Sequence, residues 1–338
     1  MEKSPFEKSM ELVCPAGNLP ALKAAVDNGA DSVYLGFKDE TNARHFPGLN
    51  FSAKNISKAV DYAHKKDAKV LVAINTFPQP AKWKVWEDAV NLAANSGADA
   101  IIVADIGVLD YATNKYPNLN RHLSVQGSAS SIESLKFYID NFGISRAVLP
   151  RVLTIEQIKE VCSNIAIDIE VFGFGSLCVM AEGRCMLSSY ATGQSPNTYG
   201  ACSPASHVKW QENRDALECR LNDILLDSYK KDENAAYPTP CKGRYNINGE
   251  TSYAFETPIS LNTVGVLDQL IAAGAKALKI EGRQRSPAYV AKVTQAWRLA
   301  IDSISKDPKS IPEQTVSELN SITEGVDSTT GPYQKEWR

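Results

Sequence analysis

Seven cysteines are the first residues in this 338-residue sequence whose type and spacing could support chemistry. Four of them, Cys178, Cys185, Cys202 and Cys241, fall in one stretch that also contains many glycines and prolines. Four thiolates can saturate a 4Fe–4S cluster, because each iron needs one protein ligand beyond its three sulfides. Structural zinc more often uses closely spaced cysteine pairs, which this stretch lacks. Spacing alone leaves three interpretations open: an iron–sulfur cluster, a zinc site or unligated thiols.

The other three cysteines fit burial better than ligation. An odd number of cysteines in a chain without a secretory signal argues against a disulfide framework. Cys14 is expected at the end of a strand and Cys162 on a helix, both as small buried hydrophobic residues. Cys219 is the remaining candidate for a spare thiol.

A second group of candidate residues follows the last predicted strand, in the segment LKIEGRQRS. Lys279, Glu281, Arg283 and Arg285 stand where the loops of barrel enzymes commonly bind anions, and arginine forks suit carboxylates. The alternative is an internal ion-pair network between Glu281 and its basic neighbours. Arg151, just past the sixth predicted strand, is a further candidate for this anion site, with a surface role as its alternative.

The segment TNARHFPGLNF, after the second predicted strand, places Arg44 and His45 over the same face. Adjacent arginine, histidine and aromatic side chains could recognise a substrate. The alternative is that Phe46 and Phe51 only anchor this loop to the body of the protein.

Short β-branched runs alternate with longer amphipathic stretches, which predicts βαβ units and a parallel sheet. The predicted strands are Glu11–Pro15, Ser32–Gly36, Lys69–Asn75, Ala100–Asp105, His122–Gln126, Arg146–Pro150, Asp168–Phe172 and Ala275–Glu281. The predicted helices include Leu19–Asn28, Ile56–His64, Trp83–Asn95 and Ile155–Cys162. Strands in this number favour an α/β fold of the closed (β/α)8 TIM-barrel type over an open sheet.

The alternation stops between residues 173 and 258, directly after the seventh predicted strand. An insertion there projects from the C-terminal face, where barrel enzymes carry their sites. The predicted organisation is therefore an N-terminal extension (1–9), a barrel domain (10–306) that includes the cluster-binding insertion (173–258), and a C-terminal tail (307–338). The tail is expected to be a surface strap without chemistry.

Composition excludes several classes of protein. Lysine and arginine number 36 and aspartate and glutamate 39, so the net charge of −3 gives no global attraction to nucleic acid. The first residues are too polar for a signal peptide, and no apolar run reaches the length of a membrane span. We therefore expect a cytoplasmic protein with no nucleic-acid partner and no membrane span. Peptidase chemistry has little support, since the sequence lacks an H-E-x-x-H helix and a G-x-S-x-G elbow.

Residues 170–189, EVFGFGSLCVMAEGRCMLSS, are similar to the signature of the collagenase-like peptidase family of unassigned catalytic type. The segments LVCPAGNLPALKAAVDNGADSVYLG, SPNTYGACSPA, YPTPCKGRY and KIEGRQRSPAYV extend the resemblance over nearly the whole chain. The resemblance implies a 4Fe–4S cluster that is held by Cys178, Cys185, Cys202 and Cys241.

Within this family, the chain most resembles the members that take part in ubiquinone biosynthesis. That resemblance implies oxygen-independent hydroxylation of ubiquinone precursors, in a heterodimer with a homologous subunit. The RNA-modifying members use prephenate as a hydroxyl source, so prephenate or a small anionic aromatic precursor is the expected ligand. Two alternatives stay open: a peptidase, and a scaffold whose cluster only holds the insertion while the partner carries out the chemistry.

Overall fold

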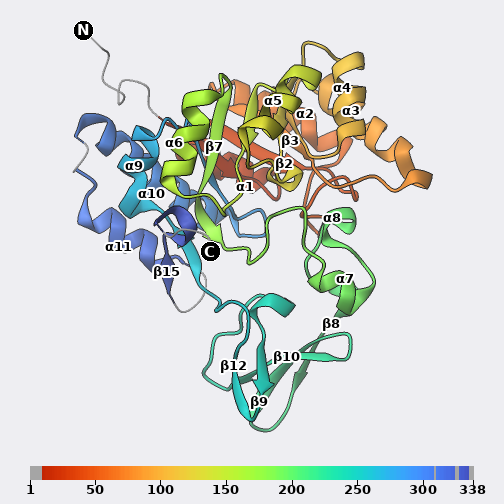
Figure 1. Cartoon of the computed structure of the whole chain (residues 1–338), viewed down its shortest axis with the longest axis vertical. Helices are drawn as coiled ribbons and strands as arrows, with labels where there is room; N and C mark the ends of the chain where they lie inside the picture. Colours follow the sequence, from red (N-terminus) through yellow and green to blue (C-terminus); the bar gives the residue numbers. More distant parts are fainter. Residues whose placement is uncertain (1–9, 308–309, 324–326, 335–338) are drawn as a thin grey trace.

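The computed structural model describes residues 10–307, 310–323 and 327–334, and it contains a closed barrel of eight parallel strands (Figure 1). The strands follow the order β14-β1-β2-β3-β4-β5-β6-β7, and β14 also pairs with β7 to close the ring. Their bounds are β1 Glu11–Pro15, β2 Ser32–Gly36, β3 Lys69–Ile74, β4 Ala100–Val103, β5 Asn120–Leu123, β6 Arg146–Val148, β7 Asp168–Ser176 and β14 Ala277–Ile280. The predicted (β/α)8 barrel is therefore confirmed. The predicted extension 1–9 and the end of the predicted tail, 335–338, lie outside the described residues.

Helices between consecutive strands form the outer layer of the barrel (Figure 1). They are α1 Leu19–Asp27, α2 Ala53–His64, α3 Trp83–Asn95, α4 Ile106–Lys115, α5 Ile132–Phe142, α6 Ile155–Asn164, α9 Leu267–Ala272 and α10 Pro287–Lys306. Helix α9 takes the place of the seventh helix, after the long insertion. Side chains that accept a hydrogen bond from the first turn fix where several of these helices begin: Asn18, Asp105, Ser131, Thr154 and Ser286.

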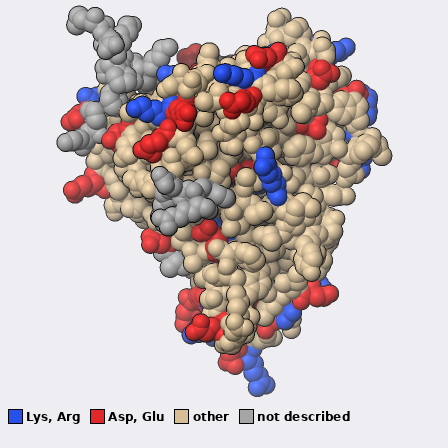
Figure 2. All heavy atoms as spheres, in the orientation of Figure 1, with Lys and Arg blue, Asp and Glu red and all other residues tan. Residues whose placement is uncertain are grey.

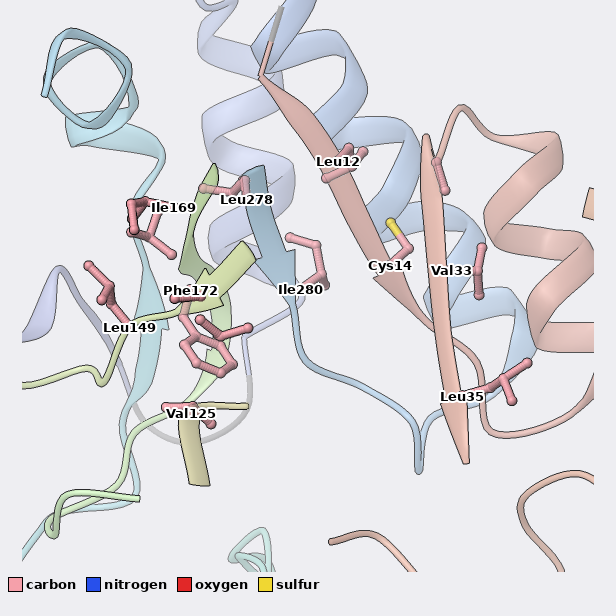
Figure 3. Packing of buried hydrophobic residues seen from close by; sticks show 14 of the residues in the cluster. Leu12, Cys14, Val33, Leu35, Val125, Leu149, Ile169, Phe172, Leu278 and Ile280 are labelled. Atoms are coloured by element: carbon pink, nitrogen blue, oxygen red, sulfur yellow. The ribbon is translucent and has the colours of Figure 1, made fainter. Parts of the chain in front are cut away.

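The main hydrophobic core lies between the outer face of the barrel and these helices. Leu12 and Cys14 of β1 and Val33 and Leu35 of β2 all belong to it (Figure 3). Successive side chains of a strand point to opposite faces, so Val13 belongs instead to a smaller apolar cluster. The alternation of β1 thus separates an apolar outer layer from the barrel interior.

Charged side chains from four strands meet inside the barrel. Strands β1 and β6 are not neighbours in the sheet, yet Arg146 lies 2.7 Å from Glu11, so this pair crosses the interior. Arg146 also lies 3.2 Å from Asp168 and 3.3 Å from Glu170, and Lys279 donates to Glu170 at 2.7 Å. Burial alone would raise the pKa of Glu11, but the hydrogen bonds and charge of Arg146 lower it to about 2. The interior is therefore held together by buried charges that neutralise one another.

Between β7 and β13 the chain forms a small lobe at one end of the barrel (Figure 1). The elements of the lobe are α7 Leu187–Thr192, α8 Pro196–Tyr199, an antiparallel sheet of β8 Val208–Glu212, β9 Ala216–Leu221 and β10 Ile224–Lys230, and a hairpin of β11 Arg244–Ile247 and β12 Glu250–Tyr253. Strand β7 runs to Ser176, past its predicted end at Phe172, because β13 (Ser260–Asn262) pairs with its last residues.

The segment after α10 packs back on the barrel. Helix α11 (Glu313–Ser321) precedes β15 (Ser328–Thr329), which pairs with β13 in parallel. In the short 3-10 turn that follows, Tyr333 is buried and its hydroxyl donates to the backbone carbonyl of Phe172 at 2.8 Å. The described part of the predicted tail is thus bound to β7, shortly before Cys178.

No helix in the described part of the chain has the length and apolarity that crossing a bilayer requires. On the face shown in Figure 2, acidic and basic side chains are interspersed and form no continuous basic patch. This surface agrees with the small net charge of the sequence, −3.

The interior charges should make the barrel sensitive to the loss of one partner. Arg146→Met keeps an unbranched apolar stem but removes the positive charge that Glu11 and Glu170 share. We expect the free energy of unfolding at neutral pH to fall by about 3–5 kcal/mol, measured by urea denaturation with far-UV circular dichroism. The control Lys84→Met removes an exposed pair with Asp88 on α3 and should leave the unfolding midpoint unchanged.

The difference in free energy of unfolding between wild type and Arg146→Met should become smaller in acid. The folded-state pKa of Glu11, about 2, lies below its ordinary value of 4.5, so its contribution to wild-type stability is complete above about pH 4.5. That contribution is lost as the pH falls from about 4.5 toward about 2. The difference in free energy of unfolding between wild type and Arg146→Met should therefore become smaller over this range. A gap independent of pH, or a loss below about 1 kcal/mol at neutral pH, would contradict a stabilising role for these charges.

Candidate metal centre at the barrel mouth

Two loops of the lobe lie against loops at the C-terminal end of the barrel, and glycines make the contacts close. At Gly183 (φ +85°), a Cβ atom would lie 2.0 Å from the carbonyl oxygen of Gln126, after β5. At Gly200 (φ +79°), a Cβ atom would lie 2.4 Å from the carbonyl oxygen of Asn42, after β2. Glycine alone combines the positive φ with so near an approach. The loops that carry three of the four clustered cysteines are thereby held at the barrel mouth.

The four cysteines come from four parts of the lobe. Cys178 follows β7, Cys185 precedes α7, Cys202 follows α8, and Cys241 lies in the 3-10 turn Pro240–Lys242. Cys178 is exposed and the other three are partly buried. Burial raises the pKa of Cys202, and the charges of Cys185 and Cys241 add to this effect. Cys202 in turn acts on Cys178, so the four thiols share one electrostatic neighbourhood.

The four cysteines match in number the ligands that a four-iron cluster takes, one thiolate for each iron. Within residues 10–307, 310–323 and 327–334, no group of three or more His, Cys, Asp or Glu converges as one ion would need. A 4Fe–4S cubane takes one thiolate at each of its four irons, so its ligands stand further apart than those of one zinc ion. The residues that would hold such a cluster are Cys178, Cys185, Cys202 and Cys241.

Two arginines supply positive charge beside these thiols. The Nη1 atom of Arg151 lies 3.8 Å from Sγ of Cys178. Arg44 interacts electrostatically with both Cys202 and Cys178. Neighbouring cations favour the thiolate form, which is the form that ligates metal.

Arg151 joins the barrel to the lobe. It follows β6, is 4% exposed, and places its guanidinium carbon 3.8 Å from the ring centre of Phe172. Its Nη2 donates to Glu281 at 2.7 Å, while its Nη1 lies 3.1 Å from Glu182. Burial alone would lower the pKa of Arg151, but these carboxylates raise it above its ordinary value. The surface role that the sequence left open for Arg151 is therefore excluded.

Glu281 receives a second arginine from the loop after β2. Arg44 Nη2 lies 3.7 Å from Glu281 Oε1, and the backbone N–H of Ser176 donates to Oε2 at 3.0 Å. Burial would raise the pKa of Glu281, but Arg151 and Arg44 lower it. Glu281 is therefore ionised, and it is the shared acceptor for three segments at the barrel mouth.

The structure brings together only part of the anion site considered from the sequence. Arg44, Arg151 and Glu281 meet at the mouth, whereas Lys279 points into the barrel and pairs with Glu170 at 2.7 Å. The ion-pair network around Glu281 exists, but its arginines come from distant loops and not from the neighbouring sequence.

The remaining predicted residues lie in different surroundings. Arg283 is 5% exposed, and its guanidinium carbon lies 5.8 Å from the ring centre of Tyr34. Arg285 is half-buried with its guanidinium carbon 5.4 Å from the ring centre of Tyr289, and His45 is also half-buried. Within the described residues, Glu281 is contacted by Arg151, Arg44 and Ser176, and not by Arg285 or His45.

Sequence reasoning missed two residues of this region. Glu182 is buried beside Arg151; burial raises its pKa, and the charge of Arg151 opposes that shift. Its position between two clustered cysteines was a usable signal. Tyr333 fixes the carbonyl of Phe172 from the C-terminal segment, and nothing in the local sequence indicated this contact.

The three cysteines outside this group are packed thiols. Burial raises the pKa of Cys14 to about 12 and the pKa values of Cys162 and Cys219 to about 11, and burial raises the pKa of Cys178 in the same way. Cys14 is buried as expected and Cys162 is half-buried. Cys219, the expected spare thiol, is also buried.

Removing Arg151 should loosen the loop that carries Cys178. In Arg151→Met, Glu281 and Glu182 lose a buried cation, so we expect amide hydrogen exchange in residues 177–186 to accelerate at least about tenfold. Exchange in β1 to β5 should change less. The matched control Arg184→Met makes the same change at an exposed position of the same loop. Equal exchange in the two variants would contradict the coupling of lobe and barrel through Arg151.

Comparison with known proteins gives the family of the chain. Residues 17–336 match the model of Peptidase family U32. The chain is 31% identical over 324 residues to tRNA hydroxylation protein P1 of Bacillus subtilis. This alignment covers 94% of this chain and 69% of the Bacillus protein. It is 33% identical over 300 residues to an uncharacterized protease of Methanocaldococcus jannaschii (87% of this chain, 66% of that protein). It is 30% identical over 298 residues to a 23S rRNA 5-hydroxycytidine synthase of Escherichia coli (88% and 40%). With a family match over nearly its whole length, the chain belongs to peptidase family U32.

Proposed function

We propose that this chain is the iron–sulfur subunit of an oxygen-independent hydroxylase of ubiquinone precursors. This is the role implied by its resemblance to UbiU, the family member of ubiquinone biosynthesis. A UbiV-like homologous subunit would complete a heterodimer in the cytoplasm. One observation supports the proposal: close contacts at Gly183 and Gly200 hold the loops that carry Cys178, Cys185 and Cys202 against the mouth of the barrel.

The names of two relatives support hydroxylation as the chemistry of this chain. One similar protein is named for the hydroxylation of tRNA and another for the synthesis of 5-hydroxycytidine in 23S rRNA. Both reactions add a hydroxyl group to a nucleic acid. For this chain we propose the ring of a ubiquinone precursor as the acceptor, in keeping with the absence of a continuous basic patch on the face shown in Figure 2.

The chain's own residues would prepare the site for a negatively charged group. Arg151 and Arg44 offset part of the charge of the four thiolates, and Glu281 holds both arginines in place. The ring of Phe172 lies 3.8 Å from the guanidinium carbon of Arg151 and shields it from water. When bound, a 4Fe–4S cluster with four cysteine ligands supplies one-electron transfer, because no iron is left open for a substrate.

Prephenate is the proposed hydroxyl donor, and the balance of atoms shows what else is required. The hydroxyl group leaves the prephenate ring and forms a C–O bond at an aromatic C–H carbon of the acceptor. The donor loses carbon dioxide and becomes aromatic as phenylpyruvate. This sum releases two electrons and one proton for each hydroxyl transferred, so the reaction also needs a two-electron acceptor such as a quinone or a redox protein.

Two alternatives make different demands on the structure. In the scaffold alternative, the cluster only holds the lobe and the partner carries out the chemistry. In the peptidase alternative, a nucleophile and a base must meet. Among the described residues, the side chains of Ser206 and His207 form a serine–histidine hydrogen bond of 3.0 Å. The two residues are adjacent in the sequence, and the bond is exposed. That pair lies in the lobe, and in the part of the chain that the structure describes no carboxylate is hydrogen-bonded to its ring.

The first functional prediction concerns the cofactor. Anaerobically purified protein should contain about four iron and four sulfide per chain, as a cubane requires. Alanine at Cys178, Cys185, Cys202 or Cys241 should remove most of the iron, because one iron then loses its protein ligand. Colorimetric iron and sulfide assays on the purified variants measure this.

Cys14→Ala and Cys219→Ala are the matched controls, since they remove buried thiols elsewhere in the fold. Both should keep the iron content of the wild type. One zinc per chain without sulfide, or iron loss in the controls to the same extent, would rule out the four-cysteine cluster.

The second functional prediction concerns the reaction. With a UbiV-like subunit, prephenate and an electron acceptor, the protein should hydroxylate a ubiquinone precursor under strict anaerobiosis. The new oxygen should not carry label from ¹⁸O₂ in a parallel aerobic trial, and omission of prephenate should stop turnover. Mass spectrometry of the product is the measurement.

Each outcome rejects a different part of the proposal. Turnover without prephenate would remove prephenate as the donor and keep the subunit assignment. Turnover that requires O₂ would reject the oxygen-independent hydroxylase itself. Full activity of the partner alone would favour the scaffold alternative.

A further inference from the structure

We infer that Arg283 binds a carboxylate group of a small organic ligand at the mouth of the barrel. The part that this ligand plays in catalysis rests on the proposed function, whereas its binding can be measured without turnover. The sequence predicts Arg283 as one of several cations of an anion site. In the structure, Arg283 differs from the other cations in its hydrogen bonding.

The guanidinium of Arg283 is buried without an acceptor. The residue is 5% exposed, and neither Nε nor Nη1 has a hydrogen-bond partner in the described part of the chain. Burial, together with the like charge of Arg44, lowers the pKa of Arg283 to about 10, so the group is still cationic at neutral pH. Since a buried, unpaired cation is strongly unfavourable, this arrangement points to a missing anion.

Other cations at the mouth and in the interior of the barrel already have carboxylates. Arg151 donates to Glu281 at 2.7 Å, and Arg44 lies 3.7 Å from the same carboxylate. Lys279 donates to Glu170 at 2.7 Å inside the barrel. An incoming anion would therefore find its open partner at Arg283, because binding at the other three cations requires an existing pair to break.

The position of Arg283 is fixed by close contacts on two sides. A Cβ atom at Gly36 would lie 2.6 Å from Nη1 of Arg283 and 2.5 Å from Cγ of Asn42. A Cβ atom at Gly17 would lie 1.9 Å from the carbonyl oxygen of Arg283. Gly36 leaves room for the guanidinium beside the end of β2, and Gly17 leaves room for the backbone of Arg283 beside the end of β1. A guanidinium held in this way loses little freedom on binding, which favours affinity.

The chemistry of the open groups selects a carboxylate. Nε and Nη1 each share one edge of the guanidinium with Nη2, and the paired N–H groups of such an edge bind a carboxylate in bidentate fashion. A phosphate would also fit such a fork. The negative charge of Glu281, which acts on Arg283, opposes a doubly charged phosphate group and favours a single carboxylate group. The side chains of Arg44 and Glu281 are 33% and 19% exposed, so this end of the barrel is within reach of solvent.

Calorimetric titration of the anaerobically purified chain with benzoate tests the inference, with benzamide as the neutral probe of the same shape. We expect saturable binding of benzoate and none of benzamide. Arg283→Gln should weaken benzoate binding at least about tenfold, because a charge-assisted fork is lost. Arg285→Gln makes the same change at a half-buried arginine two positions away and should leave binding unchanged.

A second variant guards against misfolding of Arg283→Gln. Gly36→Ala keeps the arginine but sets a methyl group against Nη1, and it should also weaken benzoate binding. Equal affinity in wild type and both variants, or no binding by the wild type, would overturn the inference. Displacement of benzoate by inorganic phosphate at similar concentration would overturn the choice of a carboxylate. Benzoate binding without anaerobic hydroxylation would keep this site and reject the proposed function.

Discussion

The buried guanidinium of Arg151 is the interaction on which the functional end of the molecule depends. It pairs with Glu281 of the barrel and Glu182 of the lobe, and it lies against Phe172 and the sulfur of Cys178. A charge so deeply buried is tolerated only when its partners are placed correctly. The first clustered cysteine and the ends of three barrel strands are therefore positioned relative to one cation.

The barrel supports this arrangement through a second group of buried charges below it. Arg146, Glu11, Glu170 and Lys279 cross the interior, while the opposite faces of the same strands pack on the helices. The parallel strands all end at the side where the lobe projects (Figure 1), so loops after β2, β5, β6 and β7 meet there. This geometry explains how Arg44, Arg151 and Cys178, far apart in the chain, come to interact.

The sequence predicted the parts that repeat and missed those that depend on distant pairing. The strands were found because β-branched runs alternate with amphipathic ones, and the start of α3 at Trp83 was predicted to the residue. Strand β7 was predicted too short, because its end is set by β13, which periodicity cannot reveal. The cysteines were found by type and by resemblance. The residues around the cysteines were predicted only in part. Lys279 points into the barrel and pairs with Glu170, and Glu281 pairs with Arg151, 130 positions away.

The same reasoning explains why the C-terminal segment was undervalued. Its composition is that of a surface strap, and nothing local distinguishes Tyr333 from an exposed tyrosine. In the structure this side chain is buried and its hydroxyl donates to the carbonyl of Phe172, whose ring lies against Arg151. The segment therefore supports the cysteine-bearing end of β7 from outside the barrel.

X-ray absorption at the iron edge of the anaerobically prepared protein tests the central claim most directly. A cubane held by Cys178, Cys185, Cys202 and Cys241 predicts a sulfur shell around each iron together with an iron–iron shell. A sulfur shell without iron–iron scattering, or a metal content that consists of zinc, would contradict a four-iron cluster at the barrel mouth.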